Sequence, residues 1–479
     1  MRKLLALVLA MVLCLSMVSI ARAEEPVKLR WILYTIDYEP KDQALVAEQL
    51  NAMSAKDIGV VIDFEYVTRD KVDLIIQSGE YFDMAYTSIT FNDYVSRANE
   101  GIFYDITDIV EEKAPKLYEY IPEMLWDATS VRGRNYSVPI LKDYAVELFW
   151  RFDPAFFVDE MGMEIPSTMA YADIEPYLAA YKEKHPNEYP LWIGRSGVTS
   201  NEYWLNWLLR DVLLCTEFPT EEGDPNATVV KLALEVDKFV DNYRLVHEWN
   251  KKGYIQPDAE TTSGIPAGQY SPVLSGQGWY GAEKVWEGVV GHGQVISRYE
   301  GPFLSTSSAQ SAMTGISSAT KYIDECLKYI EYVNTNVEYR TMLRYGLEGI
   351  HYNWNDDGTV TRTQQGTEQY NPLAYSQASY EAGPMEGEGS DPEMWTKVFA
   401  GYSDATVSST MGFTFNKADV EMEVAACLAV WNNYNSNLRA GASDPDEVIP
   451  TLIAELEAAG IRDVIAECQR QLDEFLAAE

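Results

Sequence analysis

Aromatic side chains recur at the ends of predicted strands and in the loops that follow them. Tyr34 and Tyr38 follow a first predicted strand, and Tyr86 and Thr87 stand where a third strand enters a loop rich in Thr and Ser. The other rings in such places are Tyr144, Trp192, Trp204, Trp279, Tyr280, Tyr352 and Trp354. The carboxyl ends of strands in an open α/β sheet face the ligand crevice, which makes such rings natural wall material. Because flat rings stack on the apolar C–H faces of sugars, the set indicates a carbohydrate-binding cleft, with core packing as the alternative for each ring alone.

Three charged residues are candidate partners for the polar groups of a sugar. Asp83 and Asp143 are candidate acceptors of hydroxyl protons, and Arg195 is a candidate partner for a uronic acid. Two of them have a structural alternative, since Asp83 can cap a turn and Arg195 can neutralise part of an acidic surface. We include all three among the predicted ligand-binding residues.

Sequence motifs for covalent chemistry are missing. Gly194-Arg195-Ser196-Gly197 is one residue short of the Gly-x-Ser-x-Gly nucleophile elbow. The histidines, His185, His247, His292 and His351, include no pair four residues apart on a helix, and no glycine-rich phosphate loop is present. We therefore predict no catalytic residue, no cofactor and no metal ligand. A secreted glycoside hydrolase remains the alternative, because 74 acidic residues allow many carboxylate pairs.

One segment, Asn353–Gly358, has oxygen-bearing side chains spaced as at the start of a calcium loop. Position twelve of that loop is Gln364, which cannot supply the bidentate carboxylate that calcium requires. The Asn-Asp-Asp-Gly sequence within it is typical of a hairpin turn, which we favour.

Composition excludes several classes of protein. The 479 residues include 37 Lys and Arg against 74 Asp and Glu, a formal charge of −37. Apolar residues make up 47% of the chain and aromatic residues 12%, too many for a disordered chain. The acidic balance argues against a nucleic-acid partner, because phosphate binding needs a basic face.

The N-terminal segment, residues 1–23, has the three parts of an export signal. Arg2 and Lys3 precede the apolar run Leu4–Leu15, and Ala21-Arg22-Ala23 provides a small-x-small cleavage site. We expect cleavage after Ala23 and a periplasmic, secreted or cell-surface-associated protein. No lipid anchor is expected, because Leu13 takes the place of the small residue that would precede a lipid-modified Cys14.

The four later cysteines are Cys215, Cys326, Cys427 and Cys468. Three of them, at 326, 427 and 468, fall on the apolar stripes of predicted helices. Buried free thiols are therefore favoured over two disulfides.

Hydrophobic periodicity predicts two α/β units and a helical tail. A strand over 27–34, a helix over 42–55 and a strand over 60–67 form a β-α-β unit, hence the edge of a parallel sheet. A second α/β region starts with a strand over 145–151, and its predicted elements include a helix over 201–214. The polar, turn-rich residues 364–401 are expected to form a surface connection, and helices are predicted from 416 to 478.

Several segments resemble the extracellular solute-binding proteins, family 1, of ABC importers, in particular the lipoprotein-type subgroup with a characteristic helical C-terminal region. The segments are Leu74–Met84, Gly101–Thr107, Gly133–Pro139, Gly346–Tyr352, Gly412–Phe415 and Ala459–Asp473. The resemblance implies an α/β fold of the type II periplasmic-binding-protein kind, with two lobes, a hinge and no catalytic residue. It also implies a monomer that delivers a small carbohydrate, which we expect to be an oligosaccharide, to the permease subunits of an ABC importer.

The resemblance further implies how the chain divides between the lobes. Lobe 1 is expected to comprise residues 24–142 and about 303–352, and lobe 2 residues 143–302 and about 353–479. Crossings between the lobes are expected near 141–144, near 299–305 and between about 352 and 401.

Overall fold

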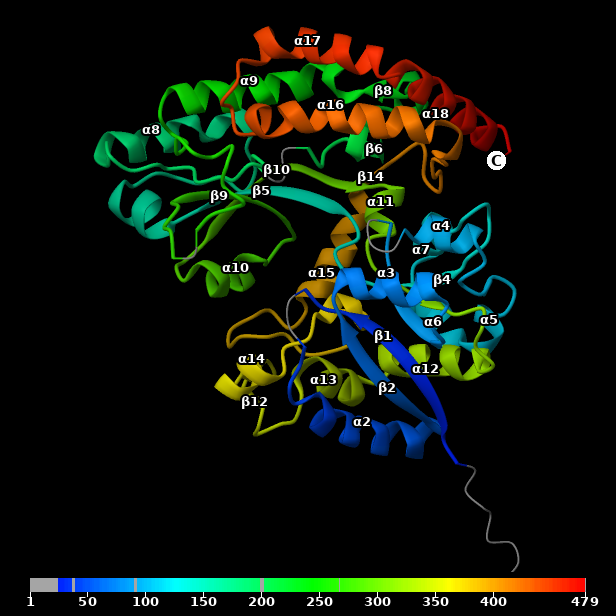
Figure 1. Cartoon of the computed structure of the whole chain (residues 1–479). Helices are drawn as coiled ribbons and strands as arrows, with labels where there is room; N and C mark the ends of the chain where they lie inside the picture. The colour runs from blue at the N-terminus through cyan, green and yellow to red at the C-terminus, as the bar shows by residue number, and fades with distance from the viewer. Residues whose placement is uncertain (1–24, 37–38, 90–92, 199–201, 267, 479) are drawn as a thin grey trace, which may run out of the picture.

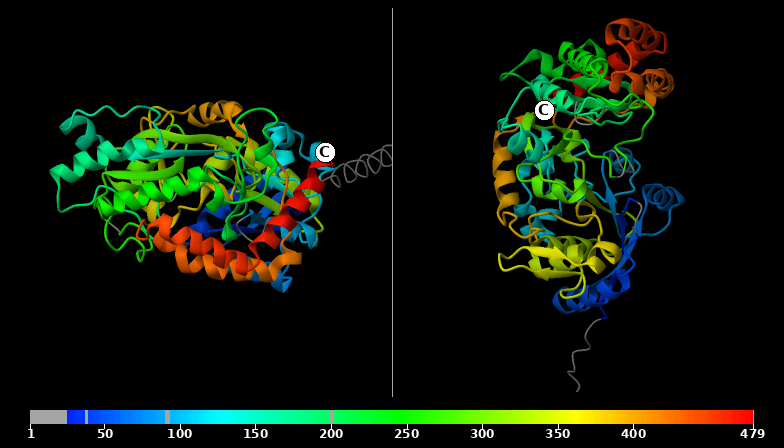
Figure 2. Two further views of the ribbon diagram at one scale, coloured as in Figure 1. Left: turned by 90° about the horizontal axis from the view of Figure 1, so that it is seen from above. Right: turned by 90° about the vertical axis from the view of Figure 1, so that its left-hand side faces the viewer.

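The computed structural model describes residues 25–36, 39–89, 93–198, 202–266 and 268–478. The predicted export signal and Tyr38 lie outside these described residues. The chain forms two lobes, one above the other in Figure 1, with α15 (Met394–Gly401) running between them. Figure 2 shows the same helix along one side of the molecule. None of the helices within the described ranges has the length and apolar character needed to span a bilayer.

The first lobe is built on a five-stranded sheet with the order β2-β1-β3-β11-β4. Its strands are β1 (Val27–Tyr34), β2 (Val60–Val67), β3 (Met84–Thr87), β4 (Ser137–Pro139) and β11 (Met313–Ile316). The strands β1, β2 and β3 are parallel, whereas β11 runs antiparallel to its neighbours. The predicted β-α-β edge is confirmed: α2 (Gln43–Ile58) joins β1 to β2 and ends at Gly59, whose φ of 72° suits a left-handed cap.

Shorter helices surround this sheet, and a hairpin of two strands extends from it. The helices are α3 (Arg69–Ser78), α4 (Tyr94–Asn99), α5 (Val110–Lys113), α6 (Pro115–Tyr120), α7 (Glu123–Ala128), α11 (Thr306–Ala309), α12 (Ile323–Thr335), α13 (Val337–Tyr345) and α14 (Gln364–Gln369). The hairpin consists of β12 (Tyr352–Trp354) and β13 (Val360–Arg362). Its turn is the predicted one, with the Asp357 carboxylate accepting the backbone N–H of Thr359 at 2.9 Å.

The second lobe contains a four-stranded sheet with the order β14-β10-β5-β9. Its strands are β5 (Val146–Phe152), β9 (Val273–Gly278), β10 (Val295–Leu304) and β14 (Thr406–Val407). Every residue of β5 is buried, including Glu147 and Arg151, because the strand lies between β10 and β9 in the interior of the sheet. A small second sheet consists of β6 (Asn206–Leu209), β7 (Leu214–Thr216) and β8 (Lys231–Leu232).

Helices cover the outer face of this lobe, as Figure 1 shows. α10 (Glu283–Val290) lies on the other side of the sheet, below β9 in Figure 1. The outer helices are α8 (Glu175–Lys184), α9 (Asp237–Lys251), α16 (Glu421–Arg439), α17 (Pro445–Ala458) and α18 (Ile461–Leu476). The last three confirm the predicted helical C-terminal region. The helix predicted over 201–214 is wrong, because this segment forms β6, a single 3-10 turn and the start of β7. β6 pairs antiparallel with β7, and the buried Asn206 amide also donates to the distant Thr410 hydroxyl at 2.8 Å, so tertiary contacts decide the conformation.

The buried side chains form a separate core in each lobe, and the chain passes from one to the other three times. Ala145 packs in the first core and Val146 in the second, and Leu304 and Phe303 mark the return. The third passage lies between Met411, which packs against the first core, and Phe413, which belongs to the second. The crossing predicted near 299–305 therefore contains an observed crossing.

The third boundary differs from the prediction. Tyr370, Met394, Trp395 and Tyr402 are buried in the first core, so the residues from 353 to about 404 lie with lobe 1 and not with lobe 2. For the same reason residues 364–401 are more than a surface connection. The buried aromatic residues of this segment are irregularly spaced among polar turn residues. The sequence therefore shows no helix or strand pattern that would mark them as core residues.

All four described cysteines are buried and unpaired. Burial raises the pKa of the Cys427 thiol to about 11 and that of Cys468 to about 12. The preference for free thiols over disulfides is confirmed.

Candidate functional site

A cavity of about 850 Å³ lies between the two lobes. The first lobe contributes α3 and the segment around α4, and the second contributes residues 203–211 and 413–417. Asp143 and the Ser/Thr-rich segment Ser305–Ser308 line it where the chain crosses between the lobes. Its volume falls within the range of about 300–1,000 Å³ that is usual for small-molecule sites.

The second-lobe face of the cavity is rich in aromatic rings. Tyr203, Trp207, Phe218 and Phe415 line it, and each ring is half-buried. Phe218 stacks on Phe303 with ring centroids 4.5 Å apart, and Trp207 packs edge-on against Phe239 at 6.0 Å. The rings are thus held from behind while part of each stays open to the cavity.

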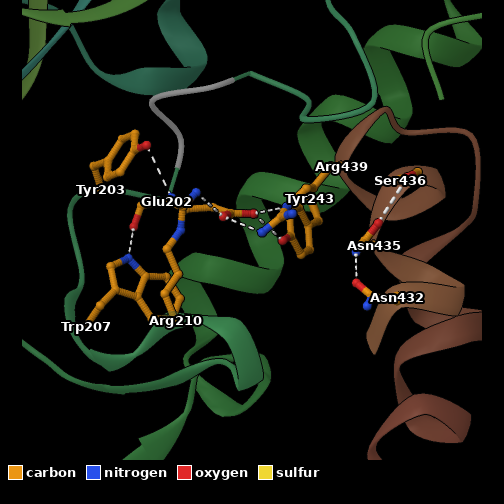
Figure 3. A network of polar contacts seen from close by, with 9 residues as sticks. All are labelled: Glu202, Tyr203, Trp207, Arg210, Tyr243, Asn432, Asn435, Ser436 and Arg439. Carbon is orange, nitrogen blue, oxygen red and sulfur yellow. Dashed lines mark hydrogen bonds and ion pairs between the residues drawn. The ribbon is translucent and has the colours of Figure 1, made fainter. Parts of the chain in front are cut away.

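A buried carboxylate lies beneath this face (Figure 3). Glu202 is 3% exposed and accepts hydrogen bonds from Arg439 at 2.6 and 2.8 Å, from Arg210 at 2.9 Å and from the Tyr243 hydroxyl at 2.8 Å. Burial by itself disfavours the charged carboxylate, but the Arg439 and Arg210 guanidiniums outweigh it and lower the pKa of Glu202. Glu202 is therefore ionised at neutral pH.

The first-lobe face is polar, and its side chains come from helix surfaces. Arg69, Asp73 and Gln77 follow one another along α3 at spacings of four residues, so they share one face of that helix. At α4, Asp93 caps the helix by accepting the backbone N–H of Ser96 at 3.3 Å. Short-range contacts of this kind also include the Ser96 hydroxyl, which donates to the Asp93 carboxylate at 2.7 Å.

Asp143 lies at the hinge end of the cavity, as a predicted ligand acceptor should. Its carboxylate is 2.9 Å from the Lys142 ammonium, and both side chains are mostly buried. The Lys142 ammonium and the Asp143 carboxylate thus form an ion pair that is largely shielded from water. Asp143 is the one predicted site residue among those that line the cavity in the described part of the chain.

Other predicted rings gather along the hinge. Tyr34 stacks on Tyr86 with centroids 5.7 Å apart, and Tyr375 packs against both. Tyr86 is 3% exposed and donates its hydroxyl to the backbone carbonyl of Ser311 at 3.2 Å. Burial raises the pKa of the Tyr375 phenol to about 12. These rings join β1 and β3 of the first lobe to the segment that leads toward α15.

A second group of rings continues along α15. Trp279, at the end of β9, packs on Trp395 with centroids 4.9 Å apart. Tyr144 packs against Tyr402 at 4.8 Å and stacks on Phe399 at 5.7 Å. We call the two groups together the hinge aromatic band: Tyr34, Tyr86, Tyr144, Trp279, Tyr375, Tyr380, Trp395, Phe399 and Tyr402. The sequence prediction thus locates rings that meet at the hinge, although most of them pack on one another.

Two predicted polar residues are committed to internal contacts. Asp83 is 1% exposed, and its carboxylate accepts hydrogen bonds from the backbone N–H of Arg30, the Tyr81 hydroxyl and the Thr320 hydroxyl. Asp83 precedes β3, at the opposite end from the cavity, and the structural alternative is the correct one. Thr87 is fully buried in β3 opposite Met313, which corrects its assignment to a ligand wall.

The remaining predicted residues lie apart from the cavity. Trp204 is 7% exposed in the second core, and Tyr352 is 6% exposed against Tyr345. Trp354 is half-exposed on the β12–β13 hairpin of the first lobe. Trp192, Arg195 and Tyr280 lie on the second lobe but are not among the cavity-lining residues. Several residues that follow a predicted strand in the sequence thus do not line the cavity. Position after a strand alone did not distinguish cavity-lining residues from the others.

Sequence reasoning missed the second-lobe face almost entirely. Tyr203, Trp204 and Trp207 fall within five residues of one another, and this local density of large rings was the available signal. The predicted helix concealed it, because on a helix the rings at 203 and 207 would share an ordinary core-facing stripe. No comparable sequence pattern indicated that residues 413–417 line the cavity.

Comparisons with known proteins place the fold. A family model described as a domain of unknown function (DUF3502) matches residues 409–477. A carbohydrate ABC transporter substrate-binding protein of Streptococcus pneumoniae serotype 4 is 24% identical, with 93% of this chain and 90% of that protein covered.

Solved structures of the N-glycan transport solute binding protein NgtS from Streptococcus pneumoniae superpose over nearly the whole chain. One described without a named ligand has a TM-score of 0.84 at 22% identity, covering 94% of this chain and 99% of NgtS. The complex with Man5GlcNAc has a TM-score of 0.73 at 22% identity, covering 95% and 99%. The resemblance stated from the sequence and the two-lobed solute-binding-protein fold are confirmed.

Proposed function

We propose that this protein is an exported solute-binding protein that captures a carbohydrate, specifically an oligosaccharide, between its lobes and delivers it to an ABC import permease. The observation that carries the proposal is the inter-lobe cavity of about 850 Å³, with rings on one face and polar side chains on the other. Sugars present both kinds of surface, since their C–H faces are apolar and their hydroxyl groups need hydrogen-bond partners. A cavity of this size accommodates several sugar rings.

The relatives support the same class of ligand. NgtS binds Man5GlcNAc in the crystal structure named above, and the curated relative is described as a carbohydrate-binding component of an ABC transporter. The TM-score is lower for that complex, 0.73, than for the NgtS structure described without a ligand, 0.84. A difference in the relative placement of two lobes lowers such a score while each lobe keeps its fold.

The mechanism that follows from the fold is capture by closure. Three chain crossings join the lobes, so the two faces of the cavity can approach each other by a hinge motion. The oligosaccharide shifts the equilibrium because it contacts both faces only in the closed state, and its affinity difference sets the extent of the shift. The permease then recognises the closed form.

Each face has a distinct task in this proposal. Trp207 and Tyr203 stack on sugar rings from the second lobe, while Gln77 and Asp73 exchange hydrogen bonds with sugar hydroxyl groups from the first. Asp143 accepts a hydroxyl proton at the hinge end. Tyr34 and Trp279 of the hinge aromatic band do not line the cavity, but their rings are half-buried and they remain predicted ligand contacts.

Export by the N-terminal segment 1–23, without a lipid anchor, belongs to the same proposal, as does the absence of catalysis. The ligand leaves the protein chemically unchanged. Release of a cleaved oligosaccharide would instead support the alternative, a secreted glycoside hydrolase.

Calorimetric titration with a panel of mannose- and N-acetylglucosamine-containing oligosaccharides tests the proposal. We expect saturable binding of at least one oligosaccharide, a higher melting temperature and an unchanged mass of the recovered glycan. At a hundredfold excess of ligand over Kd, the stabilisation amounts to about 2.7 kcal/mol. Binding of a peptide or a metal ion in place of every glycan would overturn it.

A further inference from the structure

We propose that the C-terminal helical region contributes to the ligand site. Its Arg439 is a positioning residue that holds the cavity loop in place. The cavity loop is defined as residues 202–211, of which Tyr203 and residues 205–211 line the second-lobe face. The inference rests on the proposed function, because it concerns the geometry of the same cavity. It assigns a role to the region, residues 409–477, that the family model leaves without one.

The first step is the link between the region and the loop. Arg439 is the last residue of α16, and its Nε and Nη2 atoms donate to the two carboxylate oxygens of Glu202 at 2.6 and 2.8 Å (Figure 3). Such a bidentate pair fixes direction as well as distance. The two residues are 237 positions apart in the chain, so the contact joins two segments that the sequence keeps separate.

The second step is the link from Glu202 to the side chains that face the ligand. Its backbone carbonyl accepts the Trp207 indole N–H at 2.7 Å, and its carboxylate accepts Arg210 at 2.9 Å. The Arg210 guanidinium lies over the Tyr203 ring at 4.6 Å and donates to the Tyr203 hydroxyl at 3.2 Å. Glu202 therefore contacts Arg210 through its carboxylate and Trp207 through its backbone carbonyl, and Arg210 in turn contacts Tyr203.

The third step is the rigidity of the support. Gly197 approaches the Arg439 backbone so closely that an added Cβ would lie 2.3 Å from the Arg439 carbonyl oxygen. The carbonyl groups of the next two residues, Ala440 and Gly441, are hydrogen-bonded to Asn250 and His247 of α9 at 3.1 and 2.8 Å. The end of α16 is thus clamped on both sides, and Arg439 extends from a fixed point.

The region also contributes to the wall directly. Residues 413–417 precede α16 and line the cavity next to the loop, with the ring of Phe415 half-buried. Phe413 packs on Phe475 of α18 at 5.7 Å. The C-terminal region with α16, α17 and α18 therefore contacts both parts of the second-lobe face, the cavity loop and residues 413–417.

The competing interpretation is that the Arg439–Glu202 pair is a structural anchor, which stabilises the fold and has no effect on the ligand site. A buried ion pair is weak evidence for stabilisation, and conformational specificity is the role that must be tested. The two interpretations differ in one respect: a positioning residue changes ligand affinity in a folded protein and is coupled to Trp207, whereas an anchor changes stability alone.

The test compares Arg439→Met with Arg462→Met. Arg462 belongs to α18 of the same region and pairs with Glu235 and Glu457 at 2.6 and 2.8 Å, but its partners are exposed and none lines the cavity. Titration with the oligosaccharide that binds wild type most tightly is expected to show about tenfold weaker binding for Arg439→Met and no change for Arg462→Met. Arg439→Lys should recover part of the loss.

A double-mutant cycle with Trp207→Ala supplies the decisive readout. We expect the affinity losses of Arg439→Met and Trp207→Ala to be non-additive, and hydrogen exchange of the cavity loop to rise in Arg439→Met only. If Arg439→Met does not fold, the double variant Glu202→Gln/Arg439→Gln, which removes both charges, replaces it in the same measurements.

The outcomes separate the two proposals. Wild type that binds no oligosaccharide contradicts the proposed function. Wild type that binds, together with a folded Arg439 variant of unchanged affinity or strictly additive losses, contradicts the positioning role alone.

Discussion

The two faces of the inter-lobe cavity are built in opposite ways. The first-lobe face carries polar side chains on and next to α3 and α4, with short-range pairs such as Arg97–Glu100 at 2.8 Å. The second-lobe face carries aromatic rings on and next to β6 and at residues 218 and 415. Beneath the rings at 203 and 207 lies an ion pair between the buried Glu202 carboxylate and Arg439, which is far away in the sequence.

This difference predicts how much each face contributes to the binding free energy and to closure of the lobes. Rings that are packed from behind contribute large contact areas without losing much conformational entropy on binding. Exposed polar side chains adjust their hydrogen bonds as the lobes approach. We therefore expect the second-lobe face to dominate affinity and the first-lobe face to refine it, and each prediction below tests that division.

The largest effect is expected from removing the support of the second-lobe face. Glu202→Ala leaves the mostly buried Arg439 guanidinium and the partly exposed Arg210 guanidinium without their carboxylate, and breaking a buried pair costs about 3–5 kcal/mol of the free energy of unfolding. The matched change on the first-lobe face, Glu100→Ala, removes an exposed partner of Arg97 and should cost less than about 0.5 kcal/mol. Urea unfolding followed by circular dichroism measures both.

Equal losses in the two variants would contradict the comparison between the faces. The sharper control is Glu235→Ala, which removes the exposed partner of Arg462 on the second lobe itself. A small loss there assigns the large loss to burial and not to the lobe.

The next effect concerns stacking. Trp207→Ala removes a half-buried ring from the second-lobe face, and by analogy with aromatic stacking on nucleic-acid bases the loss of affinity should be about 1–3 kcal/mol. Trp354→Ala is the matched change, because that indole is also half-exposed but lies on the β12–β13 hairpin. Calorimetric titration with the same oligosaccharide compares the two, and a loss limited to Trp354→Ala would mean that the ligand binds elsewhere.

A smaller effect is expected on the first-lobe face. Gln77→Ala removes one neutral hydrogen-bonding side chain from α3, which is worth about 0.5–1.5 kcal/mol of binding free energy. The reason is that water competes for the same hydroxyl groups of the sugar. The measurement is again calorimetry, and a loss larger than that of Trp207→Ala would reverse the proposed order of the two faces.

The same contrast explains what the sequence could predict. The β-α-β unit at the start of the first lobe and the three C-terminal helices depend on local patterns, and the described elements follow them closely. Asp143 was predicted next to an expected crossing between the lobes, and it lines the cavity, but its contact with a ligand stays a prediction. The family resemblance supplied the two-lobed plan as a whole.

The rest depended on contacts between distant residues. No local pattern at 202 or 439 shows that Glu202 meets Arg439, and the helical spacing of the rings at 203 and 207 pointed to a core stripe. Asp83 and Trp354 illustrate the opposite error, since both have the residue type and local context of a wall yet face away from the cavity. Residue type and strand position limit the candidates, but only the tertiary fold selects among them.

The smallest effect is a pH dependence that belongs to the second-lobe face. The pKa of Glu202 is lowered below its ordinary value of 4.5, so its stabilising contribution is complete well above pH 4.5 and is lost as the pH falls toward its folded-state pKa. At pH 4.5 half of the unfolded chains bind this proton while fewer of the folded molecules do, which removes up to about 0.4 kcal/mol. The free energy of unfolding of wild type should therefore fall more steeply between pH 7 and 4.5 than that of Glu202→Gln, in urea titrations at each pH. Parallel curves would mean that Glu202 does not remain ionised under Arg439 and Arg210, and the second-lobe face would then lack the charged support on which its contrast with the first depends.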